Sequence, residues 1–475
     1  MQRDGAREDA VRASRLPLWM ECIPPGVWVI LVLAAASLVV APMLESGKRA
    51  DGKVMWTFAL MHRTMYAPIL NEWNRTHDED MHVELRLLGI PALERRMMSG
   101  FLSEIPTADL IEAERSIAPR AFAGPLESVG FLDLTDRIRA EGLDEAINPP
   151  SFIPWMSRGR IFGLPHDVHP MMLAYRSDIV EAAGIDVDAI ETWDDFAREF
   201  ARVQTDANND GTPDRFALNF WPTQVEALEA LLLQAGGGFF DAEGRSIVAC
   251  PENVMVLARM GEWMAGPTRI AADAQEFTAM GNQMKLDGQV CASVMPDWLA
   301  DIWKTFIPQL EGKMKLMPLP AWEPGGRRTS AWGGSMLGIA KSAPDHDALW
   351  EFAKTLYLSD EVARALWREG DIISPIRSHW SDPMYDEPDP YFSMQPKGRM
   401  LIDLADQIPP RASSPFGRFA QLRVQDALYK LLNYRNSRPD ATRAEMEAKA
   451  AELLANADAQ VRRQMSRNRF VGGGS

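Results

Sequence analysis

Apolar and polar positions early in the chain alternate between short apolar runs and segments of helical period. Residues 54–60 form an apolar run that predicts a buried strand, and residues 66–73 place apolar side chains on one helical face. Residues 81–88 alternate as a strand does, residues 91–102 have a helical period, and residues 108–111 form a third apolar run. Strands separated by helices of this length pair in parallel, so the pattern predicts an α/β layered fold.

The rest of the chain is mostly helical in pattern, with a few extended segments between the helices. Residues 290–295 and 335–340 predict strands, and residues 315–320 are extended and rich in proline. Helices are predicted over residues 193–204, 225–233, 253–264, 349–358, 360–368, 419–432 and 441–464. The sequence contains no tandem repeat and no low-complexity block, so we expect this part of the chain to fold as a globular body.

One long apolar stretch precedes this body. Residues 23–44 carry no charge, and residues 26–44 would form a helix about 28 Å long at about 1.5 Å per residue, close to the thickness of a bilayer core. The stretch predicts a transmembrane signal anchor behind a cytoplasmic tail, residues 1–22. A cleaved signal peptide is the alternative, because small residues occur at 34–37, and a buried helix is a third reading.

A single anchor places everything after residue 45 on one side of the membrane. The charges that flank the stretch orient it only weakly, because basic residues occur on both sides. The tail of residues 1–22 is too short to be a signalling domain, which argues against a sensor kinase or chemoreceptor. We therefore expect the body on the periplasmic or extracytoplasmic face of the cell membrane.

Composition and charge narrow the class of protein further. The 475 residues suggest two or three domains, and 46% hydrophobic with 24% charged residues is ordinary for a globular protein. Asp and Glu number 66 against 50 Lys and Arg, which gives a net charge of −16. Nucleic acid is not expected as a partner, because binding it needs a basic surface, whereas this charge suits neutral or cationic solutes.

The cysteines exclude two kinds of scaffold. Cys22, Cys250 and Cys291 are too few for a disulfide-rich fold or a four-cysteine zinc site. An exported body permits a disulfide between Cys250 and Cys291, but the sequence does not show whether the two lie close together.

Five short segments, taken in their order along the chain, form a recognisable pattern. They are residues 159–165 (GRIFGLP), 173–179 (LAYRSDI), 191–196 (ETWDDF), 332–341 (WGGSMLGIAK) and 350–368, which begins with a WEF motif. Together they resemble the motifs of extracellular solute-binding proteins of sugar ABC importers, the maltodextrin-binding-like type. No single segment is specific, but their order over residues 53–465 is.

The resemblance implies a two-lobed periplasmic-binding-protein-like α/β fold with three hinge crossings. Lobe one would comprise residues 53–166 plus 325–374, and lobe two residues 171–318 plus 376–465. The ligand would be a carbohydrate held between the lobes, and the partner would be the permease of an ABC importer. Physical reasoning agrees, because concave sites form at domain interfaces and at the carboxyl ends of strands.

Sugars present apolar ring faces and rims of hydroxyls, so their sites combine aromatic plates with polar groups. Trp298 follows a predicted strand where the resemblance places a stacking aromatic, and Asp297 beside it could accept two hydroxyls. The resemblance expects a further cleft aromatic at Trp221. Alternatively, Trp298 belongs to the core and Asp297 caps a helix.

The second predicted hinge crossing contains another candidate group. Trp332 precedes Gly333 and Gly334, and glycines let a backbone approach a ligand closely. The alternative is that these residues only pack the hinge. Phe416, in the turn before a predicted helix, is a further candidate for the cleft.

Polar candidates lie at the first hinge crossing and at strand ends. His166, Asp167 and His169 could bind the ligand or simply build the hinge; a metal site there lacks further ligands in the sequence. Strand-end side chains face the cleft in this topology, and the candidates of this kind are His62, Arg63 and Glu114.

Residues 206–214 (DANNDGTPD) resemble a calcium loop, the one cofactor site that the sequence suggests. Oxygen ligands would come from Asp206, Asn208, Asp210 and Asp214, with Gly211 at the turn. Position 12 is Ala217 where a bidentate Glu is required, and the alternative is an Asx-rich turn.

The sequence contains no motif of a known catalytic constellation. It lacks G-x-S-x-G, H-E-x-x-H, the P-loop and G-x-G-x-x-G, and Asp194 with Asp195 suits the first turn of a helix. We therefore expect a binding protein and not an enzyme. A membrane-anchored exported enzyme acting on polysaccharide, and a scaffold that kept the fold without a ligand, remain the alternatives.

Overall fold

The computed structural model describes residues 52–103, 107–206 and 213–470, together with Val27. By its internal contacts the chain divides into residues 1–52 and 53–475, and the architecture below is that of the second part. The predicted tail and anchor, residues 1–22 and 23–44, lie outside the described residues apart from Val27. Among the residues described, no helix is both long and apolar enough to cross a membrane.

The first sheet has five strands in the order β2-β1-β3-β12-β6. These are β1 (Lys53–Thr57), β2 (Val83–Leu87), β3 (Leu110–Glu114), β6 (Leu164–Pro165) and β12 (Ser335–Ile339). The parallel pairing predicted for the first three strands is confirmed, because β1 lies parallel to both β2 and β3. The pattern did not show that β12 joins β3 from far along the chain, in antiparallel orientation.

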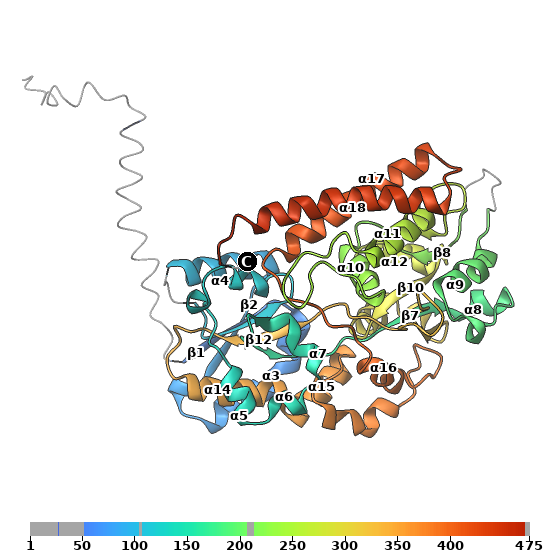
Figure 1. Cartoon of the computed structure of the whole chain (residues 1–475). Coiled ribbons are helices and arrows are strands. Elements are labelled where there is room, and N and C mark those ends of the chain that lie inside the picture. The colour runs from blue at the N-terminus through green and yellow to red at the C-terminus, as the bar shows by residue number, and fades with distance from the viewer. Residues whose placement is uncertain (1–26, 28–51, 104–106, 207–212, 471–475) are drawn as a thin grey trace, which may run out of the picture. The chain divides into compact units, whose positions relative to one another are not determined.

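Helices cover the first sheet, and its inner strands β3 and β12 are almost wholly buried, whereas the edge strand β2 has mostly exposed side chains. They include α3 (Leu60–Thr76), α4 (Ile90–Ser103) and α14 (His346–Leu358). Met65, Tyr66 and Leu70 of α3 are buried in one core with Met55 of β1 and Trp350 of α14. We call the part of the chain built on this sheet the first lobe; in Figure 1 it carries β1, β2 and β12.

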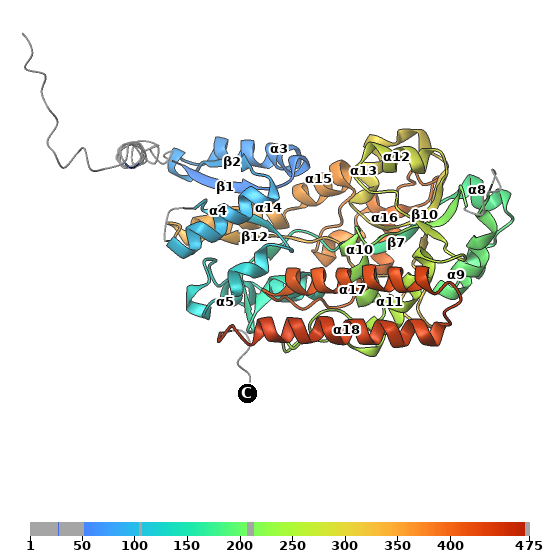
Figure 2. The same ribbon diagram turned by 90° about the horizontal axis from the view of Figure 1, so that it is seen from above.

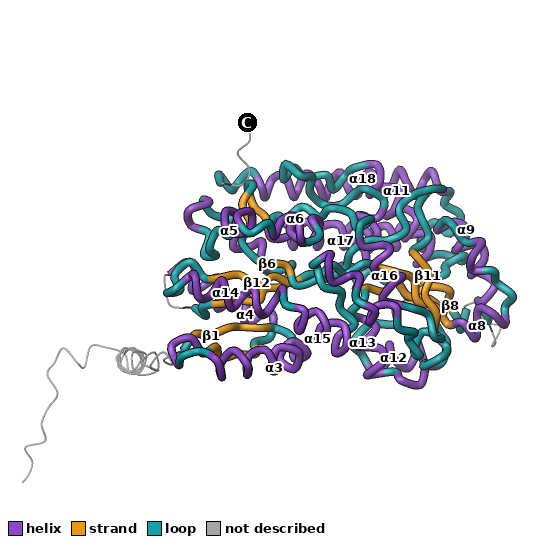
Figure 3. The backbone as a smooth tube through the Cα atoms, turned by 90° about the horizontal axis from the view of Figure 1, so that it is seen from below, coloured by secondary structure: helices purple, strands orange, loops and turns teal. Residues whose placement is uncertain are grey.

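The second sheet has the order β11-β7-β10-β8-β9. These strands are β7 (Met171–Arg176), β8 (Phe216–Asn219), β9 (Ala271–Ala272), β10 (Val290–Pro296) and β11 (Met314–Pro318). β7 runs antiparallel to both β10 and β11, while β8 is parallel to β10. Figure 3 shows the strands of the two sheets as two separate groups, and the part built on the second group is the second lobe.

Four helices pack on the second sheet and supply nearly half of the buried residues of its core. They are α10 (Val225–Gln234), α11 (Pro251–Met264), α17 (Gly417–Ser437) and α18 (Arg443–Met465). Figure 2 shows α17 and α18 side by side along α11. Both α9 (Trp193–Phe200) and α18 begin with a capping box, in which a threonine and an acidic side chain satisfy the first backbone N–H groups.

Shorter elements complete the architecture. The remaining helices are α5 (Thr135–Ala140), α6 (Leu143–Ala146), α7 (Pro149–Phe152), α8 (Ser177–Ala182), α12 (Ala279–Leu286), α13 (Leu299–Phe306), α15 (Asp360–Gly370) and α16 (Lys397–Ala405). Strands β4 (Met156–Ser157) and β5 (Arg160–Ile161) form a small hairpin.

The chain passes between the two sheets three times. The first crossing, residues 166–170, leads from β6 to β7. The second, residues 319–334, leads back from β11 to β12. The third, residues 371–376, follows α15 and leads to helices that pack on the second sheet. The two-lobed α/β architecture is thus as expected, while the finer lobe limits stay a prediction.

Candidate functional site

Asp297 connects the hinge crossings. It follows the last residue of β10 and is fully buried. Its Oδ1 accepts hydrogen bonds from His169 Nδ1 at 2.6 Å and from the Trp298 backbone N–H at 2.8 Å, and its Oδ2 accepts from the Ile373 N–H at 3.0 Å. One carboxylate therefore holds the end of a second-lobe strand to the first and third crossings. Its hydrogen bonds in the structure serve the hinge.

His169 is held between two carboxylates. Its Nδ1 faces Asp297, and its Nε2 lies 3.0 Å from Asp167 Oδ2. Burial alone would lower the pKa of His169, but the charges of Asp167 and Asp297 outweigh burial and raise the pKa to about 10. The same imidazolium, helped by His166, holds the pKa of Asp167 well below its usual range against the opposing effect of burial. The first crossing thus contains a buried charged histidine.

Trp298 and Trp332 meet beside this group. Trp298 Nε1 donates to the Trp332 carbonyl at 2.9 Å, and the two rings meet edge to face with centroids 5.7 Å apart. Trp332 Nε1 donates to Glu226 of α10 at 2.9 Å. The two predicted tryptophans are therefore neighbours, each with its polar edge satisfied.

Gly333 and Gly334 have positive φ angles of 117° and 126°. A Cβ atom on Gly333 would lie 2.6 Å from His169 Cδ2 and 2.9 Å from Trp298 Nε1. The glycine is required because protein side chains approach its backbone so closely. This contact favours the hinge-packing alternative for Gly333.

A cavity of about 290 Å³ opens at Trp332. Its lining combines aromatic, aliphatic, hydroxyl, amide and carboxylate side chains: Thr223, Gln224, Val225, Glu226, Gln275, Glu276, Phe277 and Trp332. Phe277 is 64% exposed, and its ring is parallel to that of Trp298 with centroids 6.1 Å apart. The cavity therefore offers an apolar plate beside groups that both donate and accept hydrogen bonds.

Sequence reasoning missed Phe277. The residue lies in a polar loop, DAQEFT, and has a φ angle of 62°, which is uncommon for a residue with a side chain. Strain of this kind concentrates at functional sites. A lone phenylalanine in a polar segment was the only available signal, and its backbone conformation is not readable from the sequence.

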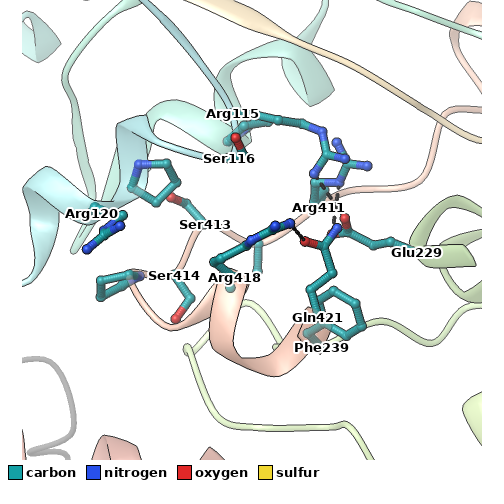
Figure 4. Close-up of a pocket in the computed structure, with 15 residues that line it drawn as sticks. Arg115, Ser116, Arg120, Glu229, Phe239, Arg411, Ser413, Ser414, Arg418 and Gln421 are labelled. Atoms are coloured by element: carbon teal, nitrogen blue, oxygen red, sulfur yellow. Dashed lines mark hydrogen bonds and ion pairs between the residues drawn. The ribbon is translucent and has the colours of Figure 1, made fainter. Parts of the chain in front are cut away.

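A second cavity, of about 50 Å³, lies between the lobes and is rich in arginine (Figure 4). Arg115, just beyond β3, donates from Nη1 to Glu229 Oε2 of α10 at 2.9 Å. Arg411 donates to the carbonyls of Ala331 and Gly333 in the second crossing, and its Nε lies 3.3 Å from Glu229. Glu229 thus holds arginines from both lobes.

The charges in this group interact strongly because the side chains of Arg115, Glu229 and Arg411 are buried. Burial, with repulsion from Arg115, lowers the pKa of Arg411 to about 10. The pKa of Glu114 is raised by burial and by the nearby carboxylate of Glu226. The Glu114 carboxylate lies 3.8 Å from Arg115 Nε, and its role in ligand binding stays a prediction.

Residues 46–363 match the family described as bacterial extracellular solute-binding protein. The chain belongs to this family. The arabinooligosaccharide-binding protein of Halalkalibacterium halodurans is 23% identical over 361 residues, which cover 75% of this chain and 78% of that one. The arabinooligosaccharide-binding protein of Bacillus subtilis is 23% identical over 410 residues, covering 83% and 91%.

Solved structures show the same fold. The sugar-binding protein MalE from Xanthomonas citri superposes with a TM-score of 0.70 at 15% identity, covering 89% of this chain and 100% of that one. The binding protein of B. animalis subsp. lactis in complex with β-1,6-galactobiose gives a TM-score of 0.68 at 16% identity, covering 89% and 99%. The family member described here therefore has a two-lobed periplasmic-binding-protein-like fold.

Four other predicted site residues do not line either cavity: His62, Arg63, Trp221 and Phe416. His62 is buried beside His166, within a cluster around Glu112, whereas Arg63 is exposed. Trp221 is half-buried against the second-lobe core. Phe416 belongs to that core and is 8% exposed, so it presents little surface to a ligand.

The predicted calcium loop lies partly outside the described residues, which include Asp206 and Asp214 but not Asn208 or Asp210. The Asp214 N–H donates to the Thr205 carbonyl at 2.7 Å. Ala217, at the position of the missing ligand, lies in a buried strand. Calcium binding stays a prediction.

No disulfide joins the two cysteines in the described part of the chain. Cys291 is buried in β10, and Cys250 precedes α11. Burial raises the pKa of both thiols, to about 12 for Cys291 and about 11 for Cys250. Both are therefore protonated, poorly nucleophilic thiols at neutral pH. Cys22 lies outside the described residues.

Proposed function

We propose that the protein captures a neutral carbohydrate at the cavity beside the hinge and delivers it to the permease of an ABC importer. The observation that carries the proposal is the lining of the 290 Å³ cavity, where Phe277 and Trp332 stand beside Gln224, Glu226 and Glu276. Pyranose and furanose rings stack on aromatic faces, and their hydroxyls pair with amides and carboxylates. Family membership and the named ligands of the relatives, arabinooligosaccharides and lactose, support a saccharide.

Closure of the lobes would make capture selective. The cavity lies against Trp332 in the second crossing, so a ligand there contacts the segment whose geometry changes when the lobes move. A ligand that binds the closed state more tightly shifts the population toward it, and the permease can then recognise both lobes together. Release follows when the permease separates the lobes.

We also propose that residues 23–44 anchor the protein on the extracytoplasmic face of the membrane. Their uncharged length matches a bilayer core, and an importer takes its solute from that side. A tether would raise the effective concentration of the body at the permease. Retention of the protein in alkali-washed membranes, with residues 1–22 found intact by mass spectrometry, tests the anchor; a mature chain that starts after residue 44 contradicts it.

The binding proposal is tested by a ligand screen on the purified protein. Arabinooligosaccharides, lactose, maltose and galactobiose are added in a thermal-shift assay and confirmed by calorimetry. At about 100 times its Kd, a true ligand stabilises the fold by about 2.7 kcal/mol. Failure of every neutral saccharide to stabilise the protein would favour the scaffold alternative.

Chromatography of the ligand after long incubation distinguishes binding from hydrolysis. We expect the saccharide to be recovered unchanged, because the cavity is proposed to bind and not to react. Shorter products, lost when Glu226 or Glu276 is replaced by Gln, would instead support the exported enzyme.

A further inference from the structure

Three metal-ligating side chains converge inside the first lobe, away from the proposed sugar cavity. His62 comes from α3, Glu112 from β3, and His166 from the start of the first hinge crossing. Each offers one ligand atom, and these atoms all lie within 4.8 Å of one another. All three residues are buried. His62 and Glu112 are 50 positions apart in the sequence, and Glu112 and His166 are further apart still, so only the fold brings them together.

The second observation is an unsatisfied nitrogen. His166 is 1% exposed, its Nδ1 lies 3.1 Å from Asp167 Oδ2, and its Nε2 is buried without a hydrogen-bond partner. Leaving a buried polar atom unpaired costs free energy, and such an atom calls for an explanation. An imidazole whose Nδ1–H is held by a carboxylate presents its Nε2 lone pair, which is the arrangement of a histidine ligand.

The carboxylate of Glu112 is also held in place by hydrogen bonds. Its Oε1 accepts hydrogen bonds from the hydroxyls of Tyr66 at 2.6 Å and Tyr357 at 2.5 Å. Its Oε2 faces His62 Nδ1 at 2.9 Å and also accepts from the Thr57 hydroxyl. Partners of this kind fix the direction of a metal ligand from outside the ligand set.

We propose that His62, Glu112 and His166 bind a Zn²⁺-type transition-metal ion. Two imidazoles and one carboxylate suit Zn²⁺ and its neighbours, whereas Ca²⁺ and Mg²⁺ prefer oxygen ligands. Bonds of about 2.1 Å in a tetrahedron place ligand atoms about 3.4 Å apart, so side-chain movements of about 1 Å close the site. A water molecule takes the fourth position. Binding displaces any proton from the two imidazoles and replaces the His62–Glu112 hydrogen bond.

The ion would fasten the hinge to the first lobe. His166 is the first residue after β6, and Asp167, its hydrogen-bond partner, also lies 3.0 Å from His169 of the same crossing. Fixing the ring of His166 therefore fixes the position of Asp167. This inference does not depend on the nature of the sugar ligand.

The test uses the full chain, freed of metal with a chelator, and no sugar. Calorimetric titration with ZnCl₂ should show one ion per chain, and CoCl₂ should give the intense visible absorption of a tetrahedral complex. Zn²⁺ should also raise the melting temperature, with reversal by the chelator. Absence of a stoichiometric Zn²⁺ complex, or Co²⁺ bound only with the weak spectrum of an octahedral complex, would overturn the proposal.

Variants separate this site from histidines elsewhere. His166→Asn should abolish the Co²⁺ spectrum, while His77→Asn, at an exposed position of the same lobe, should leave it unchanged. Tyr357→Phe keeps the buried ring but removes one hydroxyl from Glu112, and should weaken Zn²⁺ binding about 10- to 100-fold. Equal affinity in wild type and His166→Asn contradicts the proposal. If His166→Asn does not fold, the Tyr357→Phe result decides: unchanged affinity contradicts it.

Discussion

Arg115 and Glu229 join the two lobes through a buried ion pair, with Nη1 and Oε2 2.9 Å apart. Arg115 follows a strand of the first sheet, and Glu229 lies on a helix that packs against the second. Glu229 also faces Arg411, so this carboxylate pairs with two buried cations. Glu114 and Glu226 lie 3.8 Å from Arg115. The attraction between Arg115 and Glu229 therefore helps to hold the two lobes together.

Replacing Glu229 by Gln should destabilise the protein and open it. The change removes the carboxylate that pairs with Arg411, whereas Arg115 keeps Glu114 and Glu226 at 3.8 Å. Breaking a buried pair costs about 3–5 kcal/mol. Urea unfolding measures the loss, and small-angle X-ray scattering should show a larger radius of gyration. Glu94→Gln, which breaks the more exposed pair with Arg120, is the control and should cost at most about 1 kcal/mol. Equal effects of the two changes would contradict a closing role for Glu229.

His169 should make stability depend on pH on the alkaline side. Its pKa is about 10 in the folded protein and about 6.5 in the unfolded chain, so its stabilisation is complete below pH 6.5 and lost as pH rises toward 10. The free energy of unfolding should fall by up to about 1.4 kcal/mol per pH unit in that window, relative to His169→Gln. Urea unfolding from pH 6 to 10 checks the difference. Parallel curves for both proteins would show that His169 is not a charged hinge group.

Gly333→Ala should disturb the hinge more than a glycine change elsewhere. The added methyl group would meet His169 Cδ2 at 2.6 Å, and the backbone has a positive φ angle, so we expect a cost of roughly 3 kcal/mol. Gly142→Ala is the matched control, because Gly142 also has a positive φ angle but nothing lies within 4 Å of its Cβ position. It should cost about 1 kcal/mol. Similar unfolding free energies for both variants would refute close packing at Gly333.

Phe277→Ala should weaken saccharide binding without weakening the fold. The side chain is 64% exposed, so unfolding should change by less than about 0.5 kcal/mol, while loss of the stacking surface should raise Kd about 5- to 10-fold. Phe306→Ala, at a 60% exposed position on α13, is the control for loss of an exposed ring. Calorimetry with the ligand from the screen compares all three proteins. A Kd unchanged by Phe277→Ala would remove this residue from the site.

Helices and strands could be predicted where the apolar pattern of the sequence matches the face that packs in the core. The expected helices over 225–233 and 441–464 correspond to Val225–Gln234 and Arg443–Met465. The second has a repeating apolar face and begins with a capping box, while the first is mostly apolar and is followed shortly by Gly236. The first helix was expected to begin at residue 66 but begins at Leu60. Its first turn has no side-chain cap, so the sequence carries no marker of that start.

For the candidate site, the sequence predicted only which kinds of residue lie near the hinge crossings, and not which atoms contact one another. Trp298 and Trp332 pack together, and Asp297 accepts hydrogen bonds from His169 and from the Trp298 backbone. The polar side-chain atoms of these predicted residues are therefore taken up by one another and by nearby carboxylates. Phe277, whose exposure depends on an unusual backbone conformation, had no signal strong enough to select it.

The amino-acid sequence by itself determined the layered α/β class and family membership, because apolar periodicity and local motifs are properties of neighbouring residues. Only the tertiary structure decided which charges are partners across the hinge, which aromatic ring is exposed, and that His62, Glu112 and His166 form one buried cluster. The charge pair His169–Asp297 and the cluster of His62 and Glu112 join residues that are 128 and 50 positions apart, and burial, which sets the strength of such interactions, exists only once the chain has folded.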